Sequence, residues 1–351
     1  MLRNQPAHQI PDQMQTFMAS RSESCGRLMR AVPVLLTVFI LAWQVDWSTA
    51  FSAESATYSV HRTNSTITLA RPDGKPILRY VTGPLPKSEQ PQTTVPAVGY
   101  LHPVYTPSGQ VLTESGHAGG DHTWLRGVFL AWPQVRGEKP AGFWTCGQAV
   151  WKEKGHVVNR EVTATADAAG GQLTATNAWT DGQIEVLKER AWLAARLVSG
   201  VHVVDLRCEL SAFGTKDVQL LPWAFAGLAF HARRVADETV SFHSPEGEVK
   251  RSPPRWNNPE RNWPPAAWYD LLLTTKQDTA CGAAMMAHLA NGTSTWQAYY
   301  ALRMLNPNAN ATHPITVKPN KPLILRYRLV IHDGCPPVDI LDQLATEFQK
   351  N

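Results

Sequence analysis

Alternation between apolar and polar side chains in two long runs constrains the fold of this 351-residue chain more than any other feature. In residues 201–210 and 323–331, every second position is mostly apolar, and the later intervening positions carry charges. Successive side chains of a strand point to opposite faces of a sheet, so a period of two predicts half-buried strands. The register places His202 beside the core, in a structural role, and turns Arg326 and Arg328 away from it.

Other apolar runs predict further strands, and only one segment has a helical period. The additional strand-like runs are residues 183–193, 218–230, 268–274 and 281–290. Residues 337–350 predict a helix, because Pro337 begins it and apolar residues recur on one face. No linker or internal repeat divides the chain. About a dozen strands with turn signals between them predict an all-β fold, a large antiparallel β-sandwich with a short C-terminal helix.

The first fifty residues have the composition of an export signal. Arg27 and Arg30 precede the apolar run 31–43, and Ser48-Thr49-Ala50 supplies small residues for a signal peptidase. The run is shorter than the roughly 20 residues that span a membrane. We therefore expect a signal peptide and polar lead-in at 1–50 and a single sandwich domain at 51–351. The protein would be secreted or periplasmic, with no stable membrane span after cleavage; an uncleaved signal anchor is the alternative.

Charge and cysteine content exclude some classes of protein. The net charge is +4, but the basic residues are scattered, so no nucleic-acid partner is expected. Removal of the signal leaves four widely spaced cysteines and no Cys-x-x-Cys pair, which argues against a zinc knuckle. Four cysteines allow three disulfide pairings, and spacing does not choose among them. Cys208 and Cys281 lie in apolar runs, where buried thiols are the alternative.

A polar cluster that follows two glycines is the best candidate for a reactive site. It contains Asp121, His122 and Arg126, and the apolar run 128–132 after it predicts a buried strand that would hold it in place. His122 is expected to transfer protons, and Asp121 to orient it or accept substrate hydroxyls. Arg126 would bind a carboxylate or stabilise an oxyanion. The alternative is a surface ion pair between Asp121 and Arg126 beside a turn histidine.

A second candidate cluster follows the apolar run 281–290. His288 ends that run, and Asn291 begins a turn with the next glycine. A histidine at a strand end that points into a loop mouth is a candidate catalytic residue, and Asn291 a candidate ligand-binding residue. A capping role for the His288 ring is the alternative.

Tryptophans are the candidate sugar-binding residues. Trp256 and Trp263 lie in a Pro/Arg-rich loop at 244–265, and Trp124 and Trp296 lie within the two candidate clusters. Flat aromatic faces in such places are suited to stacking on a sugar ring. The alternative for each is packing in the core.

Motifs of several enzyme classes are missing from the sequence. It contains no Gly-x-Ser-x-Gly turn, phosphate-binding loop, dinucleotide fingerprint or His-Glu-x-x-His. His117 is expected to converge with His122 on the substrate, and the pair would supply two metal ligands, but spacing fixes no third. We therefore predict no metal site and identify no cofactor. A glycosidase that uses two carboxylates stays a possible class of enzyme, because its two acids need no short motif.

Several short motifs occur in a characteristic order between residues 77 and 348. They are Tyr105-Thr106-Pro107-Ser108-Gly109, Leu112-Thr113-Glu114, Asp121-His122 with Arg126-Gly127, Phe129-Leu130-Ala131-Trp132, Phe143-Trp144, Gly227-Leu228-Ala229-Phe230, His288 with Asn291 and Trp296, and Leu325-Arg326-Tyr327-Arg328-Leu329 with His332-Asp333-Gly334. By these motifs the chain resembles the exported bacterial proteins labelled PmoA-like, or methane oxygenase PmoA. That family usually has Asp-His-Pro-His-His-Arg at its central motif, whereas this chain has Thr123, Trp124 and Leu125 in place of Pro-His-His. By this comparison the chain lacks two imidazoles of the motif and is either catalytically altered or inactive.

The resemblance implies a fold and a range of functions. The family is similar to the large β-sandwich class, the supersandwich fold of galactose mutarotases and related carbohydrate enzymes. We therefore expect a secreted, carbohydrate-active enzyme, with acid–base chemistry on a sugar or glycoside by lyase, epimerase or hydrolase reaction. The alternatives are a non-catalytic glycan-binding protein, which the missing histidines favour, and the metal-dependent oxygenase of the family label.

Overall fold

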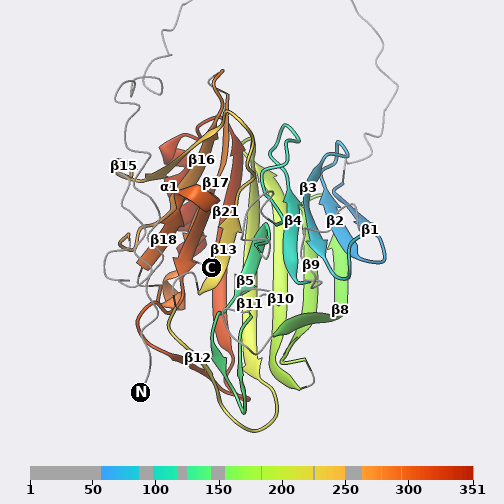
Figure 1. The fold of residues 1–351 in the computed structure, drawn as a ribbon. Coiled ribbons are helices and arrows are strands. Elements are labelled where there is room, and N and C mark those ends of the chain that lie inside the picture. The colour runs from blue at the N-terminus through green and yellow to red at the C-terminus, as the bar shows by residue number, and fades with distance from the viewer. Residues whose placement is uncertain are drawn as a thin grey trace, which may run out of the picture. The chain divides into compact units, whose positions relative to one another are not determined.

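The computed structural model describes residues 57–86, 98–116, 125–143, 155–182, 184–223, 226–249, 263–277, 279–293 and 295–350. These residues belong to one compact unit, Ser52–Asn351, built largely of antiparallel strands in three sheets (Figure 1). The predicted all-β sandwich class is confirmed.

The first sheet has eight strands and carries the N-terminal part of the described chain. In spatial order it comprises β1 (Ser59–Arg62), β2 (Thr66–Ala70), β3 (Pro76–Val81), β4 (Tyr100–Val104), β5 (Val128–Ala131), β13 (Gly227–His231), β19 (Met304–Asn308) and β18 (Thr295–Tyr299). The buried strand predicted after Arg126 is β5.

The second sheet has nine strands and contains both alternating runs of the sequence. Its order is β15 (Gly247–Glu248), β14 (Thr239–Ser244), β16 (Tyr269–Thr274), β17 (Ala280–Ala287), β21 (Leu323–Asp333), β11 (Val201–Ala212), β10 (Glu185–Val198), β9 (Gly171–Thr180) and β8 (His156–Ala166). The two alternating runs are neighbours, β11 and β21, with Val204 opposite Leu329. His202 is buried, and its Nδ1 donates to the carbonyl oxygen of Tyr105 at 2.9 Å, as a structural histidine would.

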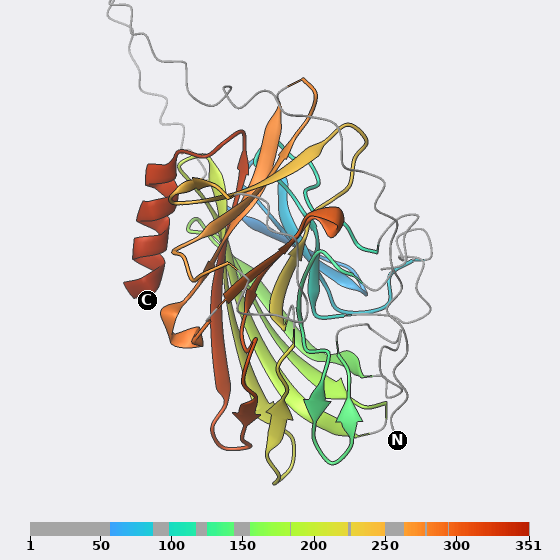
Figure 2. The same cartoon turned by 60° about the vertical axis from the view of Figure 1, so that its left-hand side comes forward.

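A small sheet and a few helical segments complete the unit. The four-stranded sheet has the order β20 (Ile315–Val317), β12 (Val218–Leu220), β6 (Val135–Arg136) and β7 (Pro140–Ala141), and lies at one end of the larger sheets (Figure 2). The described helical segments are η2 (Leu289–Asn291), η3 (Tyr300–Leu302) and α1 (Val338–Lys350). The last of these is the predicted C-terminal helix.

The two large sheets share one hydrophobic core. Leu101 and Phe230 enter it from the eight-stranded sheet, and Leu193 and Leu329 from the nine-stranded sheet. Each fully buried side chain of this size contributes about 1.5–3 kcal/mol. The opposite face of the nine-stranded sheet is covered by α1, whose buried residues pack on Trp268, Met286 and Val330.

Arg328 lies under α1 and is 2% exposed. Its register turns it away from the shared core, as predicted, but the helix then covers it. Its Nη1 donates to the carbonyl oxygen of Leu344 at 2.8 Å, and its Nε and Nη2 donate to the Asp205 carboxylate at 2.5 and 3.0 Å. The guanidinium therefore ties the helix to the sheet.

Candidate functional site

The face of the eight-stranded sheet that points away from the shared core is called here the outer face. Its residues are Arg79, Val81, Tyr100, His102, Phe129, Ala131, Ala229, His231, Met304, Asn306, Asn308, Thr295, Gln297 and Tyr299. The apolar ones form a second, smaller core cluster. Several polar ones are nonetheless buried: His231 is 1% exposed and Asn306 is fully covered. Buried polar groups gathered away from the main core indicate a site, because each must be satisfied or costs stability.

Gly127 brings three chain segments together at this face. A Cβ atom on Gly127 would lie 2.3 Å from the carbonyl oxygen of Leu101, so no larger residue fits there without a shift. The Gly127 carbonyl accepts from the His231 N–H at 2.7 Å, and the His231 carbonyl accepts from the Glu114 N–H at 3.1 Å. The backbone thus places Glu114 and His231 side by side, next to Arg126.

Glu114 and His231 form an acid–base pair. Their closest side-chain atoms, Oε2 and Nε2, are 3.9 Å apart, with the carboxylate 17% and the imidazole 1% exposed. A carboxylate and an imidazole at this distance are able to exchange a proton after a small adjustment, and both are suited to general acid–base chemistry near neutral pH.

His102 contributes a neutral hydrogen-bonding group to the same face. Thr113 Oγ1 accepts from the Val104 N–H at 3.0 Å and lies 3.0 Å from His102 Nδ1. We therefore assign the Thr113 hydroxyl as the donor, and His102 Nδ1 as the acceptor, of the second hydrogen bond. In this tautomer His102 Nε2 carries the ring proton. Burial, followed by the nearby charges of Arg79 and Arg126, lowers the pKa of His102 to about 4. The ring is therefore neutral at pH 7 and a donor through Nε2.

The depressed pKa of His102 predicts a pH dependence of stability. The unfolded chain binds a proton at the ordinary pKa of about 6.5 and the folded chain only near 4, so stability present above 6.5 is lost as pH falls. When the pH is lowered from about 7 to 4.5, the unfolding free energy of the parent should fall by about 2 kcal/mol more than that of the His102→Gln variant. Urea unfolding at both pH values measures this. His313→Gln, at an exposed histidine, is the control, and equal losses in parent and His102→Gln would contradict the assignment.

Arg126 is the one residue of the predicted central cluster that the structure describes. It is 2% exposed, its Nη1 donates to the carbonyl oxygen of Leu125 at 2.9 Å, and its Cζ lies 5.8 Å from the centre of the Tyr100 ring. This burial is contrary to the surface ion pair considered as the alternative. His117, Asp121, His122 and Trp124 lie outside the described residues, as does Trp256. The described residues on either side of this segment, Gly116 and Leu125, nevertheless lie together at the site, because the Gly116 N–H donates to the Leu125 carbonyl at 2.7 Å.

Amide and hydroxyl groups continue the outer face along β18 and β19. Asn308 Nδ2 donates to the carbonyl oxygen of Trp223 at 2.8 Å, and the Trp223 side chain is 39% exposed. Asn306 Oδ1 and Thr295 Oγ1 are buried without a hydrogen-bond partner among the described parts of the chain. An unsatisfied buried group costs about 1–3 kcal/mol, so each of these atoms would gain from any partner that reached it.

The second predicted cluster has a capping geometry. His288 Nδ1 accepts from the Ala290 N–H at 3.1 Å and caps η2, and its ring meets Phe348 edge-on at 5.6 Å. Asn291 donates to the Arg326 carbonyl at 2.7 Å and accepts from the Arg326 N–H at 2.8 Å. These bonds hold the loop against β21, and neither side chain joins the outer-face groups around His231.

The two described tryptophans that were expected to stack on sugar are packed in the core. Trp263 and Trp296 are 8% and 1% exposed, and their backbones bridge each other. Trp263 stacks on Tyr269 with ring centres 5.0 Å apart, and Trp296 lies 5.0 Å from the same ring. This burial leaves no open ring face for a ligand and corrects the stacking role expected from the polar composition of the loop.

Sequence reasoning did not select the residues that the structure assembles here. His231 is far along the chain from His102 and Glu114, and no short motif joins the three. His231 directly follows the apolar run 227–230, the same signal that drew attention to His288. Trp223 lies inside an apolar run, where its exposure is not visible from the sequence.

The described ranges contain no group of three or more His, Cys, Asp or Glu side chains placed to hold a metal ion. Cys208 and Cys281 are buried free thiols, and burial raises the pKa of both. Within the same ranges, no helix has the length and apolar character needed to cross a membrane.

Comparison with known proteins gives the family of the chain. Residues 66–346 match a family of unknown function, DUF6807, and the chain belongs to it. This finding overturns the PmoA-like assignment made from short motifs, since no methane oxygenase family is matched. No curated protein matches the sequence.

One solved structure similar to this chain is a galactose mutarotase related enzyme from Lactobacillus acidophilus. It shares 7% sequence identity, with a TM-score of 0.35, and the match covers 78% of this chain and 97% of that protein. The similarity concerns the fold.

Proposed function

We propose that this protein is an exported, carbohydrate-active enzyme whose site is the outer face of the eight-stranded sheet. The observation that carries the proposal is the Glu114–His231 pair on this face, together with the polar groups of Thr295 and Asn306, which have no hydrogen-bond partner for Oγ1 and Oδ1 in the described structure. A sugar presents hydroxyls to the polar groups of such a face, and Trp223, whose carbonyl accepts from Asn308, adds an exposed aromatic ring near it. The apolar run and small residues at 31–50 support export.

Proton transfer would come from the Glu114–His231 pair. Glu114 is the more exposed partner and acts as the base, and His231 holds and returns the proton. His102 Nε2–H donates to a sugar oxygen without introducing a charge. His122 is a further candidate from the sequence, because the described residues Gly116 and Leu125 that precede and follow its segment lie at this site. Lyase, epimerase and hydrolase reactions all use general acid–base proton transfer, which such a pair can supply.

A second candidate function is glycan binding without catalysis. The near-complete burial of His231 favours it, because a ring that is 1% exposed reaches a ligand only through Glu114. In that case the face would bind glycan through Trp223 and the amides, and no bond of the ligand would change.

Thr295→Val tests the site in either case. Valine keeps the shape of threonine and removes a hydroxyl that has no partner in the described structure, so the unfolding free energy should stay the same or rise by about 1 kcal/mol. Affinity for glycan should fall about tenfold, measured by calorimetry with the full chain and a panel of neutral and acidic oligosaccharides. Thr174→Val, on β9 of the other sheet, is the control. Unchanged affinity in Thr295→Val would refute the site.

A further inference from the structure

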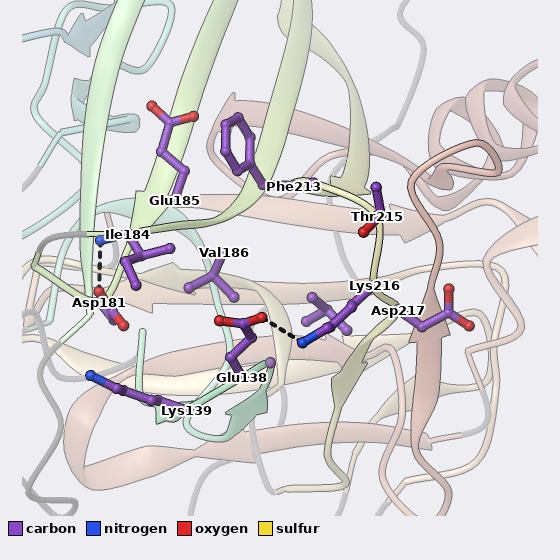
Figure 3. A pocket seen from close by; sticks show the side chains of 13 residues that line it. Glu138, Lys139, Asp181, Ile184, Glu185, Val186, Phe213, Thr215, Lys216 and Asp217 are labelled. Carbon is purple, nitrogen blue, oxygen red and sulfur yellow. Dashed lines mark hydrogen bonds and ion pairs between the residues drawn. The ribbon is translucent and has the colours of Figure 1, made fainter.

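A hollow of about 240 Å³ lies away from the outer face and shares none of its residues (Figure 3). Three connections and the strand starts after them line it: residues 137–139 between β6 and β7, Asp181 and Ile184 between β9 and β10 with Glu185 and Val186 of β10, and residues 213–217 between β11 and β12 with Val218 of β12. Connections at the end of a sandwich are common binding sites, because the sheets hold them firmly.

The inside of the hollow is apolar. Val186 and Val218 are buried among its lining residues, and Gly137 lies so close that a Cβ atom there would meet Val186 Cγ1 at 3.3 Å. Phe213 and Ile184 also line it and are 52% and 46% exposed. Phe213 therefore offers an open aromatic surface beside a small cavity.

The rim is polar, and several of its charges are paired. Lys216 Nζ lies 2.7 Å from Glu138 Oε1, which joins two of the three connections (Figure 3). Glu185 pairs with Arg160 at 2.5 Å, and Asp181 Oδ1 accepts from the Ile184 N–H at 2.9 Å. The carboxylates of Glu138, Glu185 and Asp181 accept hydrogen bonds, so the rim suits a ligand that is rich in hydroxyl donors.

We infer that this hollow binds one neutral sugar unit of a glycan, with Phe213 against the apolar face of the sugar and the rim carboxylates accepting its hydroxyls. The volume is below the roughly 300–1,000 Å³ of sites for larger ligands, which limits the occupant to one ring-sized unit. A more open hollow of about 360 Å³ shares Gly214, Thr215 and Asp217 with it, so a glycan chain has room to continue. The choice of a carbohydrate rests on the proposed function.

Phe213→Ala tests the inference, since truncating a half-exposed side chain leaves the fold intact. Calorimetry uses the full chain and neutral hexasaccharides of glucose, xylose and mannose. The parent should bind at two kinds of site, and Phe213→Ala should weaken one of them about tenfold. Leu289→Ala, at an exposed apolar residue outside the hollow, is the matched control and should bind as the parent does. Circular dichroism confirms folding of each variant.

The outcomes separate the hollow from the outer face. Loss of affinity in Thr295→Val alone overturns the inference that the hollow binds sugar and is consistent with the proposed function. Loss in Phe213→Ala alone supports the hollow and overturns the outer-face site. Binding of acidic glycans only, or of no glycan, overturns the inference of a neutral sugar.

Discussion

Replacement of Glu114 by glutamine is expected to lower turnover of the glycan substrate by about 10²–10⁴-fold, the usual contribution of a general base. Glutamine has the shape of glutamate and keeps the backbone bond to His231, but it takes up no proton. Binding through Trp223 and the amides is not affected, so kcat should fall and KM should change little. The acidic limb of the pH–rate profile, which reports ionisation of the base, should disappear.

The measurement is proton NMR of the anomeric signals during incubation of the full chain with any glycan that it binds. Glu209→Gln on β11, in the other sheet, is the control and should react as the parent does. A Glu114→Gln variant with parental kcat would remove Glu114 from the mechanism. If the parent binds glycan and changes no bond in it, the protein is a glycan-binding protein.

Arg328→Met is expected to have the largest effect on stability, about 3 kcal/mol of unfolding free energy. The substitution removes the bonds to Asp205 and to the Leu344 carbonyl, and leaves the Asp205 carboxylate without its buried partner. Asp205 is 28% exposed, so solvent moderates the cost. Since the arginine links α1 to the sheet, the helix should loosen before the rest of the unit unfolds.

Arg196→Met is the matched control, because Arg196 pairs with Asp205 at 2.9 Å and Glu347 at 3.2 Å, and Arg328 Nη2 also lies 3.4 Å from Glu347. Its side chain is 29% exposed, so the loss should be below about 1 kcal/mol. Chemical denaturation followed by circular dichroism gives both values. Equal losses in the two variants would show that burial of Arg328 contributes nothing.

The strands and the helix followed from local patterns, because each depends on neighbours in the sequence. Alternation in 201–210 and 323–331 predicts β11 and β21, and the apolar face of 337–350 predicts α1. Docking of that helix over Arg328 depends on the register of distant strands and could not be predicted.

The candidate site was less predictable for the same reason. Glu114 and His231 meet because Gly127 holds their segments together through backbone bonds, which no spacing rule contains. The stacking role predicted for Trp263 was wrong because the composition of its loop indicated exposure, whereas Phe242 and Tyr269 pack against its ring. Local composition cannot report contacts made by residues elsewhere in the chain.

Amide hydrogen exchange of the full chain, with and without a saturating bound glycan, tests the central claim most directly. A ligand on the outer face should slow exchange in β13, β18 and β19 and at Glu114, while β8 and β14 keep their rates. Protection confined to other strands, with these segments unchanged, would show that the outer face is not where glycan binds.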